Sequence, residues 1–327
     1  MSSPALRGPA WVTARQYRRT LWAALALVLL ALAAVTALRI WDARYPDTAL
    51  ENGGWNPDPD NQAFGLLQWL LQYLGTGLAL LPIAVAALVA GPMVAREYES
   101  GTYGLSLTQS VSPAAWLRSK LLLTAAGASL TALAGMGVFA LGWSRTGEAG
   151  YFLWAEPYVY VPTGVALFAY LLAALAIGAL IGQLVRHTLP AMAATALVMG
   201  LLTLVLGAYR WSLVPVETVT GPAGPTLWAP GNGLVMDTGL LTSSGARFDE
   251  SACWEQINSA PGIDTDPEAW GKAQARCFAD HDVVSQYADY HPESHFWPTQ
   301  LIESGILLAL AALALYAAFR VLRARHP

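Results

Sequence analysis

Six long runs of apolar residues constrain the fold more than any other feature of this sequence. They cover residues 21–38, 65–94, 121–143, 159–184, 189–208 and 301–319. A helix needs roughly 20 mostly apolar residues to cross a bilayer, and these runs are long enough. Only 12% of the chain is charged, whereas soluble domains carry about 25%. The sequence therefore predicts an all-α polytopic membrane protein with six transmembrane helices.

The first run raises the alternative of a cleaved signal peptide. It is 18 residues long, whereas the core of a signal peptide has about 7–15, so we expect it to stay as a span. The apolar runs then divide the chain into four regions. These are a cytoplasmic amphipathic helix (1–20), spans one to five with a cytoplasmic loop at 95–120 (21–208), an extracellular region (209–298), and the sixth span with a basic cytoplasmic tail (299–327).

The distribution of charge predicts which way the spans run. With the N-terminus inside, the inner segments hold 11 of the 18 basic residues and only two of the 22 acidic ones, Glu97 and Glu99. Cytoplasmic loops of membrane proteins carry an excess of Lys and Arg. We therefore expect a multi-pass protein with both termini in the cytoplasm. Only two of the 18 basic residues are lysines, a composition that favours a bacterial origin and hence a bacterial cell membrane.

The expected extracellular region contains the only two cysteines, Cys253 and Cys277. Because exported segments meet oxidising conditions, we expect these cysteines to form a disulfide. His291 and His295 are four residues apart, a spacing that suits zinc ligands on a helix, but Pro292 disfavours a helical turn there. A metal site and a solvated acidic loop both remain open, and we favour the loop.

Catalytic motifs are missing from the sequence. There is no GxSxG, no HExxH, no Cys-X-X-Cys and no GxxxxGK[ST] phosphate loop. An intramembrane enzyme would need ionisable groups inside its spans, and these runs carry almost none. We therefore expect neither an enzyme nor a bound cofactor or metal, and no nucleic-acid partner.

The loop between the second and third runs, AREYESGTYGLSLTQSVSPAAWLRSK, stands out by its polarity. Gly101 is a suitable stop for the preceding helix, and Ser112-Pro113 provides an N-cap and a proline at the first helical position. Between them lie the apolar residues Tyr103, Leu105 and Leu107. Exposed apolar side chains indicate a partner or a lipid surface, although a tight connector without a binding role is the alternative.

This loop resembles the one between spans two and three in membrane subunits of type-2 ABC transporters. The matching features are the acidic pair Glu97 and Glu99, Gly101-Thr102, the turn Ser110-Val111-Ser112, and Lys120 at the start of span three. Residues 11–19 (WVTARQYRR) and 296–303 (FWPTQLIE) resemble the actinobacterial branch of the same family. The large region after span five departs from the compact outer hairpins of that family.

The resemblance implies a permease subunit that pairs with a second permease copy and with a separate ATPase subunit. ATP and Mg would bind to that ATPase, which drives a coupling helix in the 95–120 loop. The implied ATPase-coupling residues are Glu97, Glu99, Gly101, Thr102, Tyr103, Leu105 and Gln109. An interfacial helix would use Trp11, Arg15, Arg18 and Arg19, with its arginines at lipid phosphates.

Two features inside the spans stand out. Glu303 lies near the start of the last run, and an acid within a membrane is a functional candidate by default. At the outer edge it can also be structural, which is the interpretation we favour.

Gly178 and Gly182 form a GxxxG pattern that permits close contact between helices without indicating the partner helix.

The function expected from the sequence is the permease of an ATP-driven exporter. Its largely apolar spans suit a lipid-like, peptide or amphipathic drug cargo better than a small ion. The alternative is a membrane-anchored sensor or ligand-binding protein that uses the extracellular region. An adjacent gene for an ATPase with a phosphate loop would distinguish the two.

Overall fold

The computed structural model describes residues 15–49, 55–101, 112–147, 153–223, 227–262 and 268–325. The chain divides into two compact units. A helical unit lies within residues 1–213 and 297–327, and a strand-containing unit lies within 214–296. The division falls within a few residues of the boundaries expected for the extracellular region.

Six helices of the described residues are long and apolar enough to cross a membrane, as the sequence predicts. They are α2 (Arg18–Asp42), α3 (Gln62–Val85) with its continuation, α6 (Pro113–Thr146), α8 (Ala166–Val185), α9 (Thr188–Tyr209) and α12 (Phe296–Arg325). The continuation of α3 runs through a π-helical turn, η1 (Ala86–Ala90), into α4 (Gly91–Glu99). Span two is therefore a helix of 38 residues, Gln62–Glu99.

The fourth span begins later than the predicted residue 159. A separate short helix, α7 (Pro157–Thr163), precedes α8. The break falls at Gly164, whose backbone is extended (φ −119°, ψ −178°). Pro162 also lies here and cannot donate a backbone hydrogen bond, which weakens helical continuity. Hydropathy does not register such a break, because Val159, Val161 and Val165 are as apolar as the span that follows.

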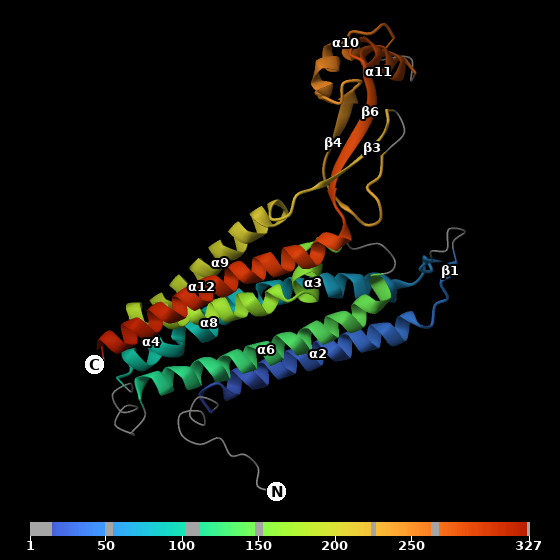
Figure 1. Ribbon diagram of the computed structural model, residues 1–327. Helices are drawn as coiled ribbons and strands as arrows, with labels where there is room; N and C mark the ends of the chain where they lie inside the picture. The colour runs from blue at the N-terminus through green and yellow to red at the C-terminus, as the bar shows by residue number, and fades with distance from the viewer. Residues whose placement is uncertain are drawn as a thin grey trace. The chain divides into compact units, whose positions relative to one another are not determined.

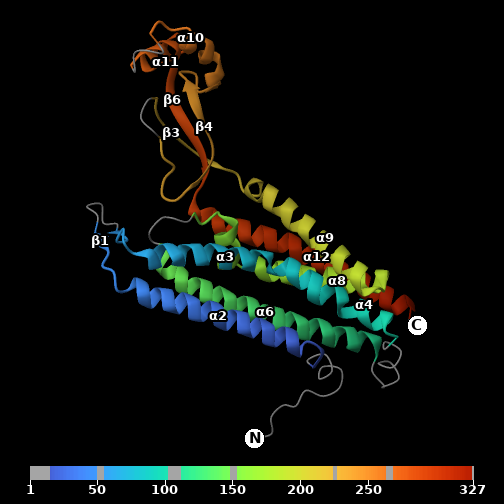
Figure 2. The same cartoon turned by 180° about the vertical axis from the view of Figure 1, so that it is seen from behind.

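Within the helical unit, α2 lies beside α6, and α9 lies beside α12 (Figures 1 and 2). α8 is the most enclosed span, with 61% of its apolar window buried, whereas α2 has only 6%. The core around α8 consists mainly of alanines. Its buried members are Ala86, Ala166, Ala169, Tyr170, Ala173, Ala174, Ala176, Met199, Leu206, Leu307, Ala311 and Ala314. Small side chains let helices approach closely where lipid supplies no hydrophobic driving force between them.

The helix termini gather at two ends of this bundle (Figure 1). The starts of α2, α6 and α9 lie at the same end as the last turns of α4, α8 and α12. We call this the Glu97 end and the opposite one the Arg145 end. The described basic residues that the charge pattern assigns to the inner side lie in or next to these helix ends. They are Arg15, Arg18, Arg19, Arg96, Arg118, Lys120, Arg186, Arg320, Arg323 and Arg325.

The strand-containing unit corrects the all-α prediction, whereas the helical unit is helical apart from one short hairpin. Its antiparallel sheet has the order β3 (Glu217–Pro222), β6 (Val283–His291), β4 (Leu234–Thr242) and β5 (Arg247–Phe248). The turn between β4 and β5 uses Gly245 at φ +79°, a conformation that favours glycine. A further short hairpin, β1 (Thr48–Ala49) with β2 (Trp55–Asn56), follows α2 in the helical unit.

An ion-pair cluster joins the strands of this sheet. Asp289 of β6 is buried and accepts from the hydroxyl of Thr218 at 2.6 Å and from Arg247 at 2.6 Å. These two contacts, that of Thr218 first, lower the pKa of the Asp289 carboxyl. Arg247 also pairs with Asp237 of β4 at 3.1 Å and lies over the ring of Tyr287. The cluster therefore links β4, β5 and β6 through charged side chains.

A disulfide between Cys253 and Cys277 links parts of the small core of the same unit, as predicted. It joins the segment before α10 (Trp254–Asn258) to α11 (Ala269–Asp280). Both cysteines are buried with Ile257 and Ala273. So small a core gains much of its stability from a covalent link.

Replacing both cysteines with serine is expected to lower the free energy of unfolding of this unit by about 3 kcal/mol, because the loop closed by the bridge is no longer constrained. Limited proteolysis of the full-length protein, followed in denaturant, measures this difference. Dithiothreitol should reproduce the effect on the wild type and leave the double serine variant unchanged. Equal protease resistance of the two proteins would contradict the stabilising role of the disulfide.

Candidate functional site

A buried carboxylate, that of Glu97, lies at the end of span two, where the loop to span three begins. Its Oε1 lies 2.5 Å from Nζ of Lys120, and its Oε2 accepts from Nε1 of Trp116 at 3.0 Å. Lys120 also donates to the backbone carbonyl of Met93 at 3.2 Å, and Nε2 of Gln16 donates to Glu97 at 3.5 Å. We call these five residues the Glu97 cluster. It ties α4, α6 and the segment before α2 together.

The surroundings of this cluster are apolar. Glu97 is 8% exposed and Lys120 only 3%. Leu117, Ala179 and Leu322 pack around Met93 and Trp116. An ion pair removed from water persists only when it is paired and hydrogen-bonded, because desolvation costs several kcal/mol per ion. The cluster meets this condition, so the two helices that flank the loop are held in one arrangement.

Local sequence explains why these side chains meet. α4 ends at Glu99, and Gly101 takes up the left-handed conformation at φ +69°, which confirms it as the helix stop. Ser112 caps α6 by accepting from the backbone of Ala115 at 3.2 Å, with Pro113 as the first helical residue, again as predicted. Trp116 and Lys120 follow four residues apart and so share the face of α6 that points toward Glu97.

Glu97 and Glu99 have partners within the chain, and their coupling to an ATPase stays a prediction. The carboxylate of Glu97 contacts Lys120 and Trp116 within the Glu97 cluster. Glu99 is exposed and accepts from the backbone N–H of Thr188 at 2.9 Å, with the imidazole of His187 at 3.7 Å. A carboxylate is favourable there because the N-terminus of α9 carries partial positive charge. Both acids therefore fix the Glu97 end of the bundle.

Several predicted site residues lie outside the described residues. These are Thr102, Tyr103, Leu105 and Gln109 of the expected coupling helix, and Trp11 of the expected interfacial helix. Arg15, Arg18 and Arg19 are described and exposed, and the last two begin α2. Their contact with lipid phosphates stays a prediction.

Small residues connect the cluster to the core of the bundle. Gly178 of α8 packs against Ala90, and Gly182 packs against Gly91 and Val94. The GxxxG partner that the sequence does not indicate is therefore span two of the same chain. The contact falls at η1, which lies between Pro82 and Pro92. There the hydroxyl of Tyr17 donates to the carbonyl of Val89 at 3.4 Å. Prolines and π-helical turns interrupt the regular hydrogen bonding of a helix.

Glu303, the candidate intramembrane acid, is fully buried at the Arg145 end. Its Oε1 accepts from Tyr170 at 2.5 Å and from Arg210 at 2.9 Å. Its Oε2 accepts from Tyr160 and from Nε of Arg210, both at 3.0 Å. The carboxylate is thus saturated by partners from α7, α8 and the end of α9. This geometry supports the structural interpretation. Arg210 was not predicted as a partner, because the fifth apolar run ends at residue 208.

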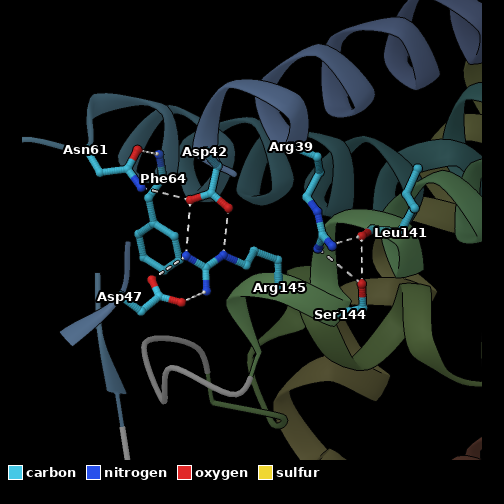
Figure 3. Close-up of polar contacts among 8 residues, drawn as sticks. All are labelled: Arg39, Asp42, Asp47, Asn61, Phe64, Leu141, Ser144 and Arg145. Atoms are coloured by element: carbon cyan, nitrogen blue, oxygen red, sulfur yellow. Dashed lines mark hydrogen bonds and ion pairs between the residues drawn. The ribbon is translucent and has the colours of Figure 1, made fainter. Parts of the chain in front are cut away.

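A second polar cluster joins α2, α3 and α6 at the Arg145 end (Figure 3). Arg145 pairs with Asp42 at 2.6 Å and with Asp47 at 2.7 Å. Asn61, the N-cap of α3, donates to Asp42 at 2.9 Å and accepts from the backbone of Phe64. At each end of the bundle, therefore, charged side chains with little exposure form ion pairs that link different spans.

The histidine pair of the strand-containing unit does not lie on a helix. His291 ends β6, and His295 belongs to a 3₁₀ turn, Glu293–His295, with their Nδ1 atoms 3.0 Å apart. Among the described residues, His, Cys, Asp and Glu form no group of three or more that is placed to hold a metal ion.

Comparison with known proteins identifies the family. A family model described as ABC-2 membrane transporter related matches residues 20–210. The chain belongs to this family. No curated protein matches it. This ABC-2-related chain is thus a multi-pass membrane transport component of the type-2 ABC permease kind. The match covers every member of the Glu97 cluster except Gln16 and ends at Arg210, so the strand-containing unit and α12 lie outside it.

The Lys120→Met variant of this ABC-2-related protein is expected to lose about 3–5 kcal/mol in free energy of unfolding, because it leaves Glu97 buried without a countercharge. The double variant Glu97→Leu/Lys120→Met should lose much less, since no charge remains buried. Unfolding of the detergent-solubilised protein in denaturant measures all three. Arg118→Met, an exposed change on the same helix, is the control and should have little effect. A double variant as unstable as Lys120→Met would show that the pair is not coupled.

Proposed function

We propose that the chain is the permease subunit of an ATP-driven exporter. Family membership supports a permease of an ABC transporter, and the chain carries no phosphate loop of its own. The observation that carries the mechanism is the Glu97 cluster. It joins the two helices that flank the 95–120 loop, so a push on that loop moves spans two and three together rather than bending one of them.

The geometry suggests a route for such a motion. α4 contacts both α8 and α9, and the Ala90–Gly178 and Gly91–Gly182 contacts leave little space between spans two and four. Close-packed interiors transmit displacement rather than absorb it. A separate ATPase, binding ATP and Mg, would act on the loop residues. A second permease copy would complete the path, as the family resemblance implies. A lipid-like or amphipathic cargo suits the apolar spans.

The proposal places the Glu97 end in the cytoplasm, in keeping with the basic residues gathered there. A membrane-impermeant maleimide tests this on intact cells. Both native cysteines are in the disulfide, so an introduced cysteine is the one free thiol expected to react. Thr102→Cys or Gln109→Cys should react only after permeabilisation, whereas Ser244→Cys in the strand-containing unit should react directly. Labelling of Thr102→Cys from outside would overturn the orientation and with it the coupling mechanism.

Coupling itself can be measured as the ATP turnover of the copurified complex. Glu97→Gln is expected to lower turnover in the complex about fivefold or more while the ATPase still copurifies, because a typical coupling free energy has this size. Glu303→Gln is the matched control. It also removes a buried charge from an ion pair, but at the opposite end of the bundle. Equal losses in both variants would mean that Glu97 affects stability rather than coupling.

The second candidate function is a membrane-anchored binding protein. One observation favours it: the strand-containing unit has its own sheet and disulfide and exposes Trp228 (80%) and Trp254 (66%). Such exposed aromatic residues are enriched at binding surfaces. Purification from native membranes separates the two functions, because a permease brings an ATPase with it and an anchored sensor does not.

A further inference from the structure

An apolar cavity of about 330 Å³ lies among α2, α6, the end of α3 and η1. Its lining residues lie within 17–27, 81–89 and 123–131, and all of them except Tyr17, Thr20, Thr124 and Thr131 are apolar. Three of these, Leu21, Leu27 and Leu88, are 45–68% exposed, so the cavity opens toward the side of the bundle. In a membrane, that opening faces lipid.

The interior of the cavity offers little to a polar ligand. The hydroxyl of Thr124 donates to the carbonyl of Lys120 at 2.8 Å, that of Thr131 to Gly127 at 2.9 Å, and that of Tyr17 to Val89. Water needs two to four polar partners to occupy a cavity. An empty apolar cavity loses dispersion contacts along its whole wall. Hydrocarbon is the occupant that this lining accepts.

Two arginines flank the end of the cavity formed by Tyr17 and Thr20. Arg18 and Arg19 lie between these two lining residues in the sequence and are exposed. The described acids at the Glu97 end do not offset them, because Glu97 pairs with Lys120 and Glu99 contacts the start of α9. A ligand that complements this site has a hydrocarbon chain and an anionic head.

We propose that this cavity binds one acyl chain of an anionic phospholipid from the surrounding bilayer, with its headgroup at Arg18 and Arg19. The apolar lining selects the chain, and the two arginines select the charge, since basic residues near a membrane surface attract anionic lipids. The bound chain lies against η1, the interruption in span two. This inference needs no ATPase, so it stands or falls separately from the proposed function.

The test uses the full-length protein reconstituted in vesicles of equal parts phosphatidylglycerol and phosphatidylcholine. After mild detergent extraction, native mass spectrometry should show one phosphatidylglycerol retained in preference to phosphatidylcholine. Ala24→Phe/Ala128→Phe fills the cavity and should abolish this retention. Leu130→Phe, an exposed change on α6 outside the lining, is the control and should leave it intact.

The charge requirement is tested separately. Arg18→Gln/Arg19→Gln should reduce the preference for phosphatidylglycerol by about fivefold per arginine. Arg320→Gln/Arg323→Gln removes two exposed arginines from the same end of the bundle on α12 and should leave the preference unchanged.

A measurement on the wild-type protein gives a test that does not depend on whether the variants fold. Phosphatidylglycerol with a photoactivatable group at the end of its acyl chain should crosslink to cavity residues such as Ala84, Val85 or Ala128. Equal retention of both lipids, or crosslinks spread evenly over the exposed faces of α9 and α12, would overturn the proposal. So would crosslinking of Leu27→Cys between two copies of the chain with no lipid retained, since the opening would then be a subunit interface.

Discussion

The buried pair of Glu97 and Lys120 is the interaction on which the arrangement of the helical unit depends. It spans the loop between α4 and α6 and is enclosed by Trp116 and Met93. Because a charge left alone in such surroundings is costly, neither helix can move away from the other without breaking a cooperative cluster. At the opposite end, Arg145 and Glu303 hold other sets of helices in the same manner. Between these ends the spans touch mainly through alanine and glycine.

Much of this could be predicted from the sequence, because membranes restrict the choice of structure. Backbone groups in a bilayer must find partners within the segment, so apolar length alone identifies helices. Local chemistry located Gly101 as a stop and Ser112 as a cap. The break at Gly164 was not predicted, because hydropathy reports composition and not backbone conformation. The sheet of the strand-containing unit was not predicted either, because it depends on pairing between β3, β6 and β4, which are distant in the sequence.

The candidate site shows the same limit. Sequence reasoning found Glu97 and Glu99 by their isolation among basic residues, but a partner distant in the sequence is not visible in a charge pattern. Lys120 is 23 residues from Glu97, and the contact depends on the angle at which α4 and α6 meet. Arg210 is 93 residues from Glu303. Such pairings depend on tertiary packing, which a single sequence does not reveal.

The π-helical turn in span two has a geometric consequence for the whole subunit. A turn that accommodates one extra residue shifts everything beyond it by about 100° around the helix axis, relative to an unbroken α-helix. The two halves of span two are therefore rotated relative to an unbroken helix. Gly75 in the first half lies against Tyr158 of α7, and Gly91 in the second half lies against Ala191 and Met192 of α9. One transmembrane segment thus serves two sets of neighbours, one in each half of its length.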